Sequence, residues 1–256
     1  MSAMQSSLST SINDRRCSYQ SLKTNSQAKV SINDRKRFRK RQQKKMITNG
    51  ILVEEQTKAK FQETIDDGLI AVGCGVREKK VAFMNVKVYA VAFYVEKSKY
   101  TKQLLDGDFT KAIAIELARD CASKDFYAAL DEAVRPRIAR IATDMATKED
   151  CDGNFMTTTA EEAEEAEERA LDDLDELKRF MSGKDKLPSG EKIAFVFNAK
   201  ESAIALEMRA FSTTKTFKSH EFARALLDVY VGDDPISPSA KDNFLAGVAA
   251  LESSKM

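Results

Sequence analysis

The stretch GVREKKVAFMNVKVYAVAFYVE occupies residues 75–96 and decides the fold. Its second half, 86–95, is rich in Val, Tyr, Phe and Ala, which is typical of a largely buried strand. As one strand, the stretch would be far longer than the usual strand of about 5–6 residues. We therefore expect it to bend within VAFMN at 81–85, although this segment lacks the Asn-Gly signal of a tight hairpin.

Such a bend makes two unusual residues neighbours. If the bend centres on Phe83, then Arg77 and Tyr89 each lie six residues from it and share one face of the sheet. A guanidinium beside a phenol suits a carboxylate or an oxyanion, and Val91 and Phe93 would continue the same face. The alternative is that Arg77 pairs with a surface carboxylate and Tyr89 is ordinary core. Spacing alone favours this alternative, because pockets are few in any protein.

The rest of the chain predicts further strands. Apolar patterns indicate strands at 51–65, 69–76 and 111–120, and a hairpin whose arms are 193–197 and 203–208 around the polar turn NAKE. The sequence DDG at 66–68 predicts a turn. The glycines of VGCGV leave room for another backbone to approach closely.

Helices are expected between and after these strands. Ser123 can cap a helix that Pro136 kinks or breaks, Ser219 can cap a helix at 219–230, and Ser237 with Pro238 can start the last one. An acidic helix at 160–181 carries one narrow stripe of Ala, Leu and Met, so we expect a solvated cover element. Five or six strands and four or five helices that do not strictly alternate predict an α+β fold, an antiparallel β-sheet covered by a layer of α-helices.

The N-terminal segment 1–50 differs from the body 51–256. It carries 12 Lys and Arg against 2 Asp and Glu, whereas the remainder carries 29 against 38, so the charges are +10 and −9. Few large apolar residues predict disorder in 1–50. The basic run 34–45 suits nucleic acid, an anionic membrane or an import receptor, or it is a solvated tail. The Ser- and Arg-rich composition of the N-terminal segment fits a targeting segment for a plastid or another organelle; otherwise we expect a cytoplasmic protein.

Several classes of site are not expected. The four cysteines are far apart and His220 is the only histidine, so the sequence predicts no metal site and no cysteine–histidine nucleophile. No phosphate-binding glycine loop or nucleophile elbow occurs, and no apolar stretch is long enough to span a membrane. We expect no cofactor, no nucleic-acid binding by the body, and a monomer.

Three stretches together resemble the chalcone isomerase family. They are GCGVREKKVAFMNVKVYAVAFYVE, AIELARDCASKDFYAALDEAVRPR and ALLDVYVGDDPISPSAKDNFLAGV, in this order, and the resemblance covers roughly 54–252. It implies an open-faced β-sandwich, an antiparallel sheet with helices layered on it. The family includes true flavonoid isomerases and non-catalytic relatives that bind fatty acids in the same cleft.

The resemblance also implies which branch the chain follows. Arg77 matches the isomerases, but Tyr89 stands where they have Thr and the fatty-acid-binding relatives have Tyr. The isomerase Tyr and Asn fall on Phe126 and Ala133, with Tyr127 one step away, and a late Thr or Ser falls on Asp228 or its neighbour.

Isomerisation needs donors that stabilise a developing enolate, and Phe126 and Ala133 supply none. The resemblance therefore implies a non-catalytic protein that binds a fatty acid or similar lipophilic carboxylate. Arg77 and Tyr89 would hold the head, Val91, Phe126, Tyr127 and Asp228 are possible pocket residues, and no residue is expected to be catalytic. The alternative is an isomerase, an intramolecular lyase, acting on a chalcone or flavonoid-type substrate.

Overall fold

The computed structural model describes residues 47–48, 50–65, 68–81, 83–147, 159–199 and 205–253. All of them belong to one compact unit, Lys44–Met256. Most of the segment 1–50 lies outside the described residues, and so does the basic run 34–45, so the expectations for them stay predictions.

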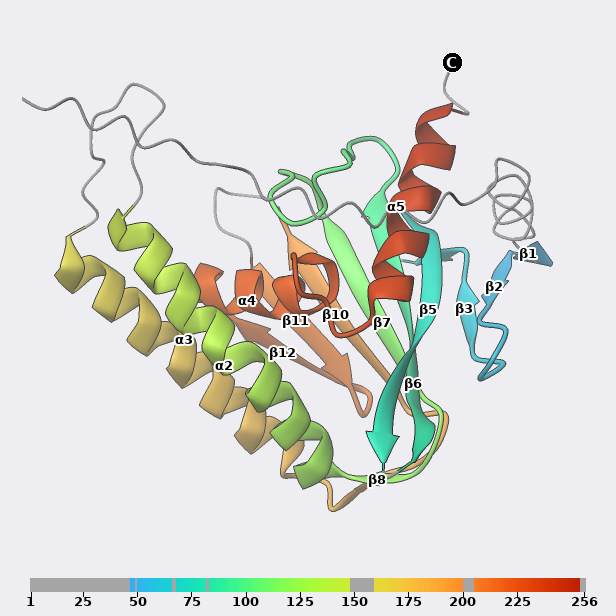
Figure 1. Ribbon diagram of the computed structural model, residues 1–256, viewed down its shortest axis with the longest axis horizontal. Coiled ribbons are helices and arrows are strands. Elements are labelled where there is room, and N and C mark those ends of the chain that lie inside the picture. Colours follow the sequence, from blue (N-terminus) through green and yellow to red (C-terminus); the bar gives the residue numbers. More distant parts are fainter. Residues whose placement is uncertain are drawn as a thin grey trace, which may run out of the picture. The chain divides into compact units, whose positions relative to one another are not determined.

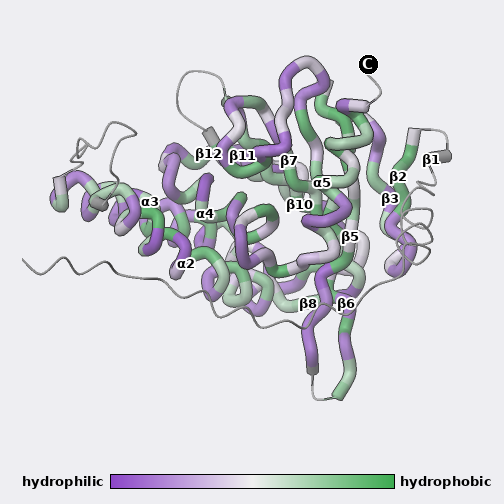
Figure 2. The backbone as a smooth tube through the Cα atoms, turned by 45° about the horizontal axis from the view of Figure 1, so that its top comes forward, coloured by the Kyte–Doolittle hydropathy of each residue, from purple (hydrophilic) through white to green (hydrophobic). Residues whose placement is uncertain are grey.

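The centre of the fold is a seven-stranded antiparallel sheet (Figure 1). Its spatial order is β12-β11-β10-β7-β6-β5-β4, and every neighbouring pair is antiparallel. In chain order the strands are β4 (Thr64–Ile65), β5 (Leu69–Val81), β6 (Met84–Glu96), β7 (Lys111–Leu117), β10 (Lys192–Asn198), β11 (Ala205–Ala210) and β12 (Thr213–Phe217). The expected bend in 81–85 is confirmed, because Val81 pairs with Met84 across the turn. The paired ends of β5 and β6 project past the neighbouring strands (Figure 2).

Four helices in the described residues cover one face of this sheet (Figure 1). They are α2 (Ser123–Thr147), α3 (Ala160–Met181), α4 (His220–Val231) and α5 (Pro238–Ser253). The main apolar core lies between the helices and the sheet, and alternate residues of the central strands enter it. The expected mixed α+β architecture, an antiparallel sheet with a helical layer, is therefore confirmed.

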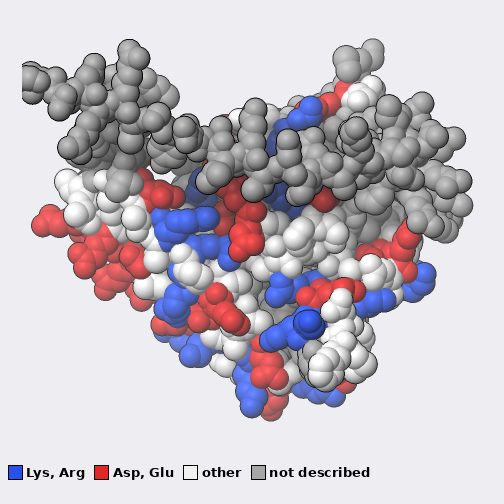
Figure 3. Space-filling view, in the orientation of Figure 1, with Lys and Arg blue, Asp and Glu red and all other residues white. Residues whose placement is uncertain are grey.

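The acidic helix has the predicted structure. All six residues of its narrow stripe are buried, namely Ala163, Ala166, Ala170, Leu174, Leu177 and Met181. Asp and Glu side chains gather over the outer surface of α3 near its start (Figure 3). Thr159 and Glu162 form a reciprocal capping box there, which stabilises the first turn.

The other face of the large sheet is partly covered by a small sheet. Its strands are β1 (Ile47–Thr48), β2 (Ile51–Val53) and β3 (Lys60–Gln62), and Leu52 and Phe61 pack with Ala90, Ala92 and other small residues of the central strands. A separate pair joins β8 (Cys121–Ala122) to β9 (Lys186–Leu187).

The prediction of one strand at 51–65 was wrong. The Glu54 carboxylate accepts hydrogen bonds from the backbone N–H groups of Gln56 and Thr57, and this turn divides the segment into short strands. Such local side-chain bonds compete with extended pairing. Strand β12 was not predicted.

The expected break at Pro136 was also wrong, because α2 is continuous through it. Pro136 removes one backbone bond, but Val134 and Ile138 beside it are fully buried, and their packing outweighs that loss. Ser219 caps α4 as predicted. Helix α5 begins at Pro238, as predicted. The side chains of Ser123 and Ser237, however, donate their hydroxyl hydrogens to the distant carbonyls of Met181 and Val76.

The predicted close approach at the glycines is confirmed. A Cβ atom on Gly75 would lie 2.6 Å from the Ala240 Cβ of α5, and one on Gly73 would lie 2.7 Å from the Asn243 carbonyl oxygen. Gly247 of α5 meets β5 in the same way, because a Cβ there would overlap the Val72 carbonyl. Helix α5 can therefore lie directly on β5 and hold the residues around Arg77 in place.

Candidate ligand-binding site

The β5–β6 hairpin brings Arg77 and Tyr89 together. The two residues are direct cross-strand partners, as predicted. The turn joins Val81 to Met84, and the register then shifts between the Arg77 and Glu78 pairs. The extra residue on β6 that this shift creates restores the predicted pairing of Arg77 with Tyr89.

Tyr89 belongs to a buried aromatic group beneath the helices. Its hydroxyl oxygen lies 3.3 Å from the hydroxyl oxygen of Tyr230 on α4, and its ring centroid lies 6.3 Å from that of Phe126 on α2. Tyr89 and Tyr230 are 7% and 2% exposed. Burial raises the pKa of both phenols, while the charge of Arg77 is a smaller, opposing influence on each pKa. Both groups are therefore neutral hydrogen-bond donors at neutral pH.

Arg77 is half-buried and faces this group. Its Nη1 donates to the carbonyl oxygen of Ile236 over 2.6 Å. The hydroxyl of the next residue, Ser237, donates to the Val76 carbonyl, so the α4–α5 connection is bonded to β5 at Arg77 and at the residue before it. Within the described part of the chain, no carboxylate forms an ion pair with Arg77. Among the described residues, Arg77 therefore does not form the surface ion pair that was the alternative expectation.

The other predicted pocket residues have different surroundings. Val91 is fully buried two residues beyond Tyr89, on the helix-facing side of β6. Tyr127 points away from the Tyr89 group, since its hydroxyl donates to Asp131 over 3.0 Å. Burial, followed by the effect of Asp131, raises the pKa of Tyr127 to about 12. Phe126 thus contacts Tyr89, whereas the hydroxyl of Tyr127 bonds within α2.

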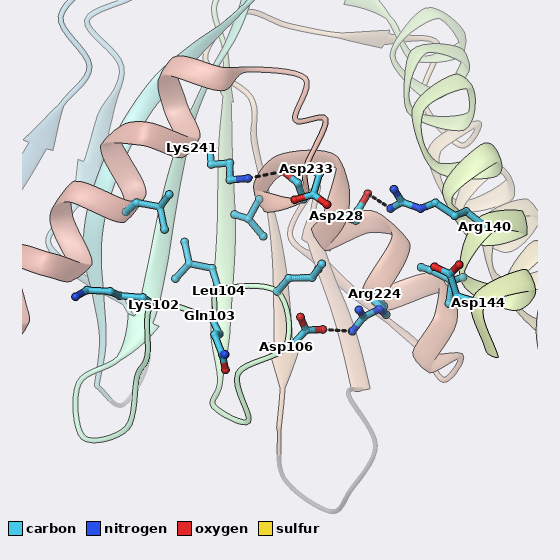
Figure 4. Close-up of a pocket in the computed structure, with 15 residues that line it drawn as sticks. Lys102, Gln103, Leu104, Asp106, Arg140, Asp144, Arg224, Asp228, Asp233 and Lys241 are labelled. Atoms are coloured by element: carbon cyan, nitrogen blue, oxygen red, sulfur yellow. Dashed lines mark hydrogen bonds and ion pairs between the residues drawn. The ribbon is translucent and has the colours of Figure 1, made fainter. Parts of the chain in front are cut away.

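Asp228 belongs to a separate ionic group. Its carboxylate accepts hydrogen bonds from Arg137 and Arg140 of α2, each over 2.8 Å, and its side chain is 5% exposed. Asp228 lines a polar cavity of about 490 Å³ between α2, α4, α5 and the 102–106 connection (Figure 4). Lys102, Arg140, Arg224 and Lys241 balance Asp106, Asp144, Asp228 and Asp233 in its wall, and Arg77 and Tyr89 do not line it.

Two contributors to the Arg77 site were not predicted. Tyr230 follows Asp228 by two residues in the segment that carries the family resemblance, but no local pattern marks it as a partner of Tyr89. The Ile236 carbonyl has no side-chain signal at all. Among the described residues no group of His, Cys, Asp and Glu could hold a metal ion, and no helix there is long and apolar enough to cross a membrane.

Comparisons with known proteins identify similar chains. No protein-family model matches this chain. It is 24% identical over 205 residues to fatty-acid-binding protein 1 of Arabidopsis thaliana, covering 78% of this chain and 71% of that protein. A crystal structure of an Arabidopsis thaliana fatty-acid binding protein matches with a TM-score of 0.60 and 19% identity, over 78% of this chain and 98% of that one. The two chains share their fold.

Proposed function

We propose that this chain is a chalcone isomerase-like protein that binds a fatty acid or a similar lipophilic carboxylate without catalysing a reaction. The carboxylate head would lie against Arg77 and Tyr89. The single observation that carries the proposal is a guanidinium without a carboxylate partner among the described residues, beside two buried neutral phenols.

The hydrogen bonds of the site leave donors available. Tyr89 and Tyr230 hold two hydroxyl hydrogens and use one between themselves, so one has no acceptor among the described residues. Arg77 uses one of its five N–H hydrogens on Ile236 in the described contacts. A carboxylate carries lone pairs and a negative charge that both groups would satisfy.

An apolar tail has a suitable surface beside these donors. Val91 and Phe93 follow Tyr89 along the helix-facing side of β6, and Phe93 stacks on Phe244 of α5 with centroids 5.3 Å apart. Both are fully buried, so a tail would enter by displacing side chains between the sheet and the helices. Fatty-acid-binding protein 1 of Arabidopsis thaliana, to which this chain is similar in both sequence and structure, is named for fatty-acid binding and supports this class of ligand.

The isomerase alternative lacks donors where it needs them. The side chains of Phe126 and Ala133 on α2 offer no hydrogen bond to a developing enolate. Phe126 contacts Tyr89, and Ala133 is partly buried against the main core. We therefore expect cyclisation of a chalcone to proceed at its spontaneous rate in the presence of the protein. A rate that rises in proportion to protein concentration would support the isomerase instead.

Oleic acid binding tests the proposal directly. The full chain should bind a fluorescent fatty-acid analogue, oleate should displace this analogue from the chain, and the chain should carry fatty acid in native mass spectrometry. Arg77→Ala should weaken oleate binding by about tenfold or more, because a hydrogen bond to a charged group contributes roughly 1.5–3 kcal/mol.

Arg119→Ala is the matched control, because Arg119 is an exposed arginine between β7 and β8. It should bind oleate as the unaltered chain does. Equal oleate affinity of Arg77→Ala and the unaltered chain, with identical circular dichroism, would overturn the proposal.

A further inference from the structure

The far end of the β5–β6 hairpin is a free two-stranded ribbon. Strand β6 pairs with β7 only over 89–95, and β5 pairs with β4 only at Leu69 and Ile70. Beyond the Arg77–Tyr89 pair, the ladder pairs β5 and β6 only with each other, and this end projects from the sheet (Figure 2). At its base, the Val88 carbonyl accepts a hydrogen bond from the Ala118 N–H, and the Lys87 ammonium donates to the Gln56 carbonyl. Four further residues of β5 and the turn extend the ribbon by about 15 Å at roughly 3.3 Å per residue.

The tip of this ribbon is apolar. Phe83 is 99% exposed and Met84 is 70% exposed, and these are the large apolar side chains that the described chain leaves exposed. Neither contributes to either core cluster. Removing these two side chains from water would be favourable, because burial of apolar surface contributes roughly 25 cal/mol per Å².

Positive charge surrounds the tip. Lys79, Lys80 and Lys87 are exposed on the two strands, and Glu78 is the acidic residue among them. Lys79 lies opposite Val86, which places both on the face that also carries Met84. Basic side chains therefore lie a few residues behind the apolar end, on both faces of the ribbon.

We propose that this tip docks on an anionic lipid bilayer, with Phe83 and Met84 in the interface and the three lysines at the headgroups. Aromatic residues favour the membrane–water interface, and lysines near an anionic surface are attracted to it. Two side chains at the end of a narrow ribbon are too small for a stable protein interface, which buries about 1,200 Å² or more. A bilayer requires no complementary pocket, so it suits this geometry better than a protein partner.

Docking would also orient the proposed ligand site. Arg77 lies six residues from Phe83, so the carboxylate site would lie about 20 Å from the lipid surface. This last consequence rests on the proposed function. The docking itself does not, and its test uses no fatty acid.

The absence of tryptophan from the sequence makes the test specific. Phe83→Trp in the full chain places one reporter at the tip, whose fluorescence is independent of binding by the basic run 34–45. Vesicles of phosphatidylcholine with phosphatidylserine should shift its emission to shorter wavelength and protect it from aqueous quencher. Ala139→Trp, at an exposed position on α2, is the matched control and should show neither effect.

Charge removal tests the role of the lysines. In the Phe83→Trp background, Lys79→Gln with Lys80→Gln should raise the lipid concentration at half-maximal shift by about 25-fold, at about fivefold per lysine. No shift with anionic vesicles would overturn the proposal, and so would an equal shift with pure phosphatidylcholine vesicles.

Discussion

The hydroxyl of Tyr89 in the sheet lies 3.3 Å from that of Tyr230 on α4, and this pair links the two layers beside Arg77. One phenol donates and the other accepts, and both are buried. The link joins residues 141 positions apart in the sequence. It gives the candidate site a fixed polar end within an otherwise apolar interface.

Replacing Tyr230 by Phe should destabilise the fold modestly. Tyr230→Phe leaves the buried Tyr89 hydroxyl without its partner, so the free energy of unfolding should fall by about 1 kcal/mol, measured by urea denaturation. Tyr127→Phe is a suitable control, because Asp131 keeps its bond to Arg135 and the loss should be smaller. Equal losses in the two variants would contradict the buried link.

Gly247→Ala should be among the most harmful small substitutions. Its Cβ would overlap the Val72 carbonyl, so α5 must move away from β5. We expect the free energy of unfolding to fall by about 2 kcal/mol or more. Gly183→Ala is the control, since its Cβ would lie 3.5 Å from the Phe180 carbonyl oxygen, an ordinary contact. If both variants melt at the same temperature, the close approach is not rigid.

Asp228→Asn should destabilise the fold, because it leaves the charges of Arg137 and Arg140 without their carboxylate partner. Asp228 is nearly fully buried between Arg137 and Arg140, and the side chain of Arg137 is itself 13% exposed. Removing the carboxylate should lower the free energy of unfolding by about 3 kcal/mol. In the exposed pair of Asp131 with Arg135, Asp131→Asn should cost roughly 0.5 kcal/mol or less. Urea denaturation of both variants measures the two losses in the free energy of unfolding. Similar losses would contradict the prediction.

The burial of Lys111 should make the free energy of unfolding rise at alkaline pH. Its side chain is buried on β7, where Nζ donates to the carbonyls of Leu104 and Gly107 and lies 4.3 Å from the Phe109 ring centroid. Burial lowers the pKa of Lys111 from 10.5 to about 8. Between these values the unfolded chain binds one more proton than the folded chain, so the free energy of unfolding increases with pH.

The increase should reach at most about 3 kcal/mol and should be absent below pH 8, where both states are protonated. Denaturation of the unaltered chain and of Lys111→Met from pH 7 to pH 10.5 isolates this contribution. Lys111→Met should lack the increase. Parallel pH profiles for the two chains would refute the assignment to Lys111.

Local sequence patterns were sufficient where one face of an element is buried. The apolar stripe of α3, the alternation of β7 and the cap of α4 by Ser219 follow from periodicity and backbone capping, which act over a few residues. The same reasoning failed at Pro136 and in 51–65. There the outcome depends on burial of α2 and on the Glu54 carboxylate, neither of which is a periodic signal.

The sequence by itself determined the antiparallel hairpin and its bend, because both are properties of one continuous segment. The pairing of Arg77 with Tyr89 also depends on the register shift between Arg77 and Glu78, which no local pattern predicted. Only the tertiary structure decided what those residues meet. Tyr230 and the Ile236 carbonyl come from 141 and 159 positions away, and Asp228 turns toward α2 instead of toward Arg77. Such contacts depend on how helices pack on a sheet, and that packing is set by the whole core instead of by the residues that touch.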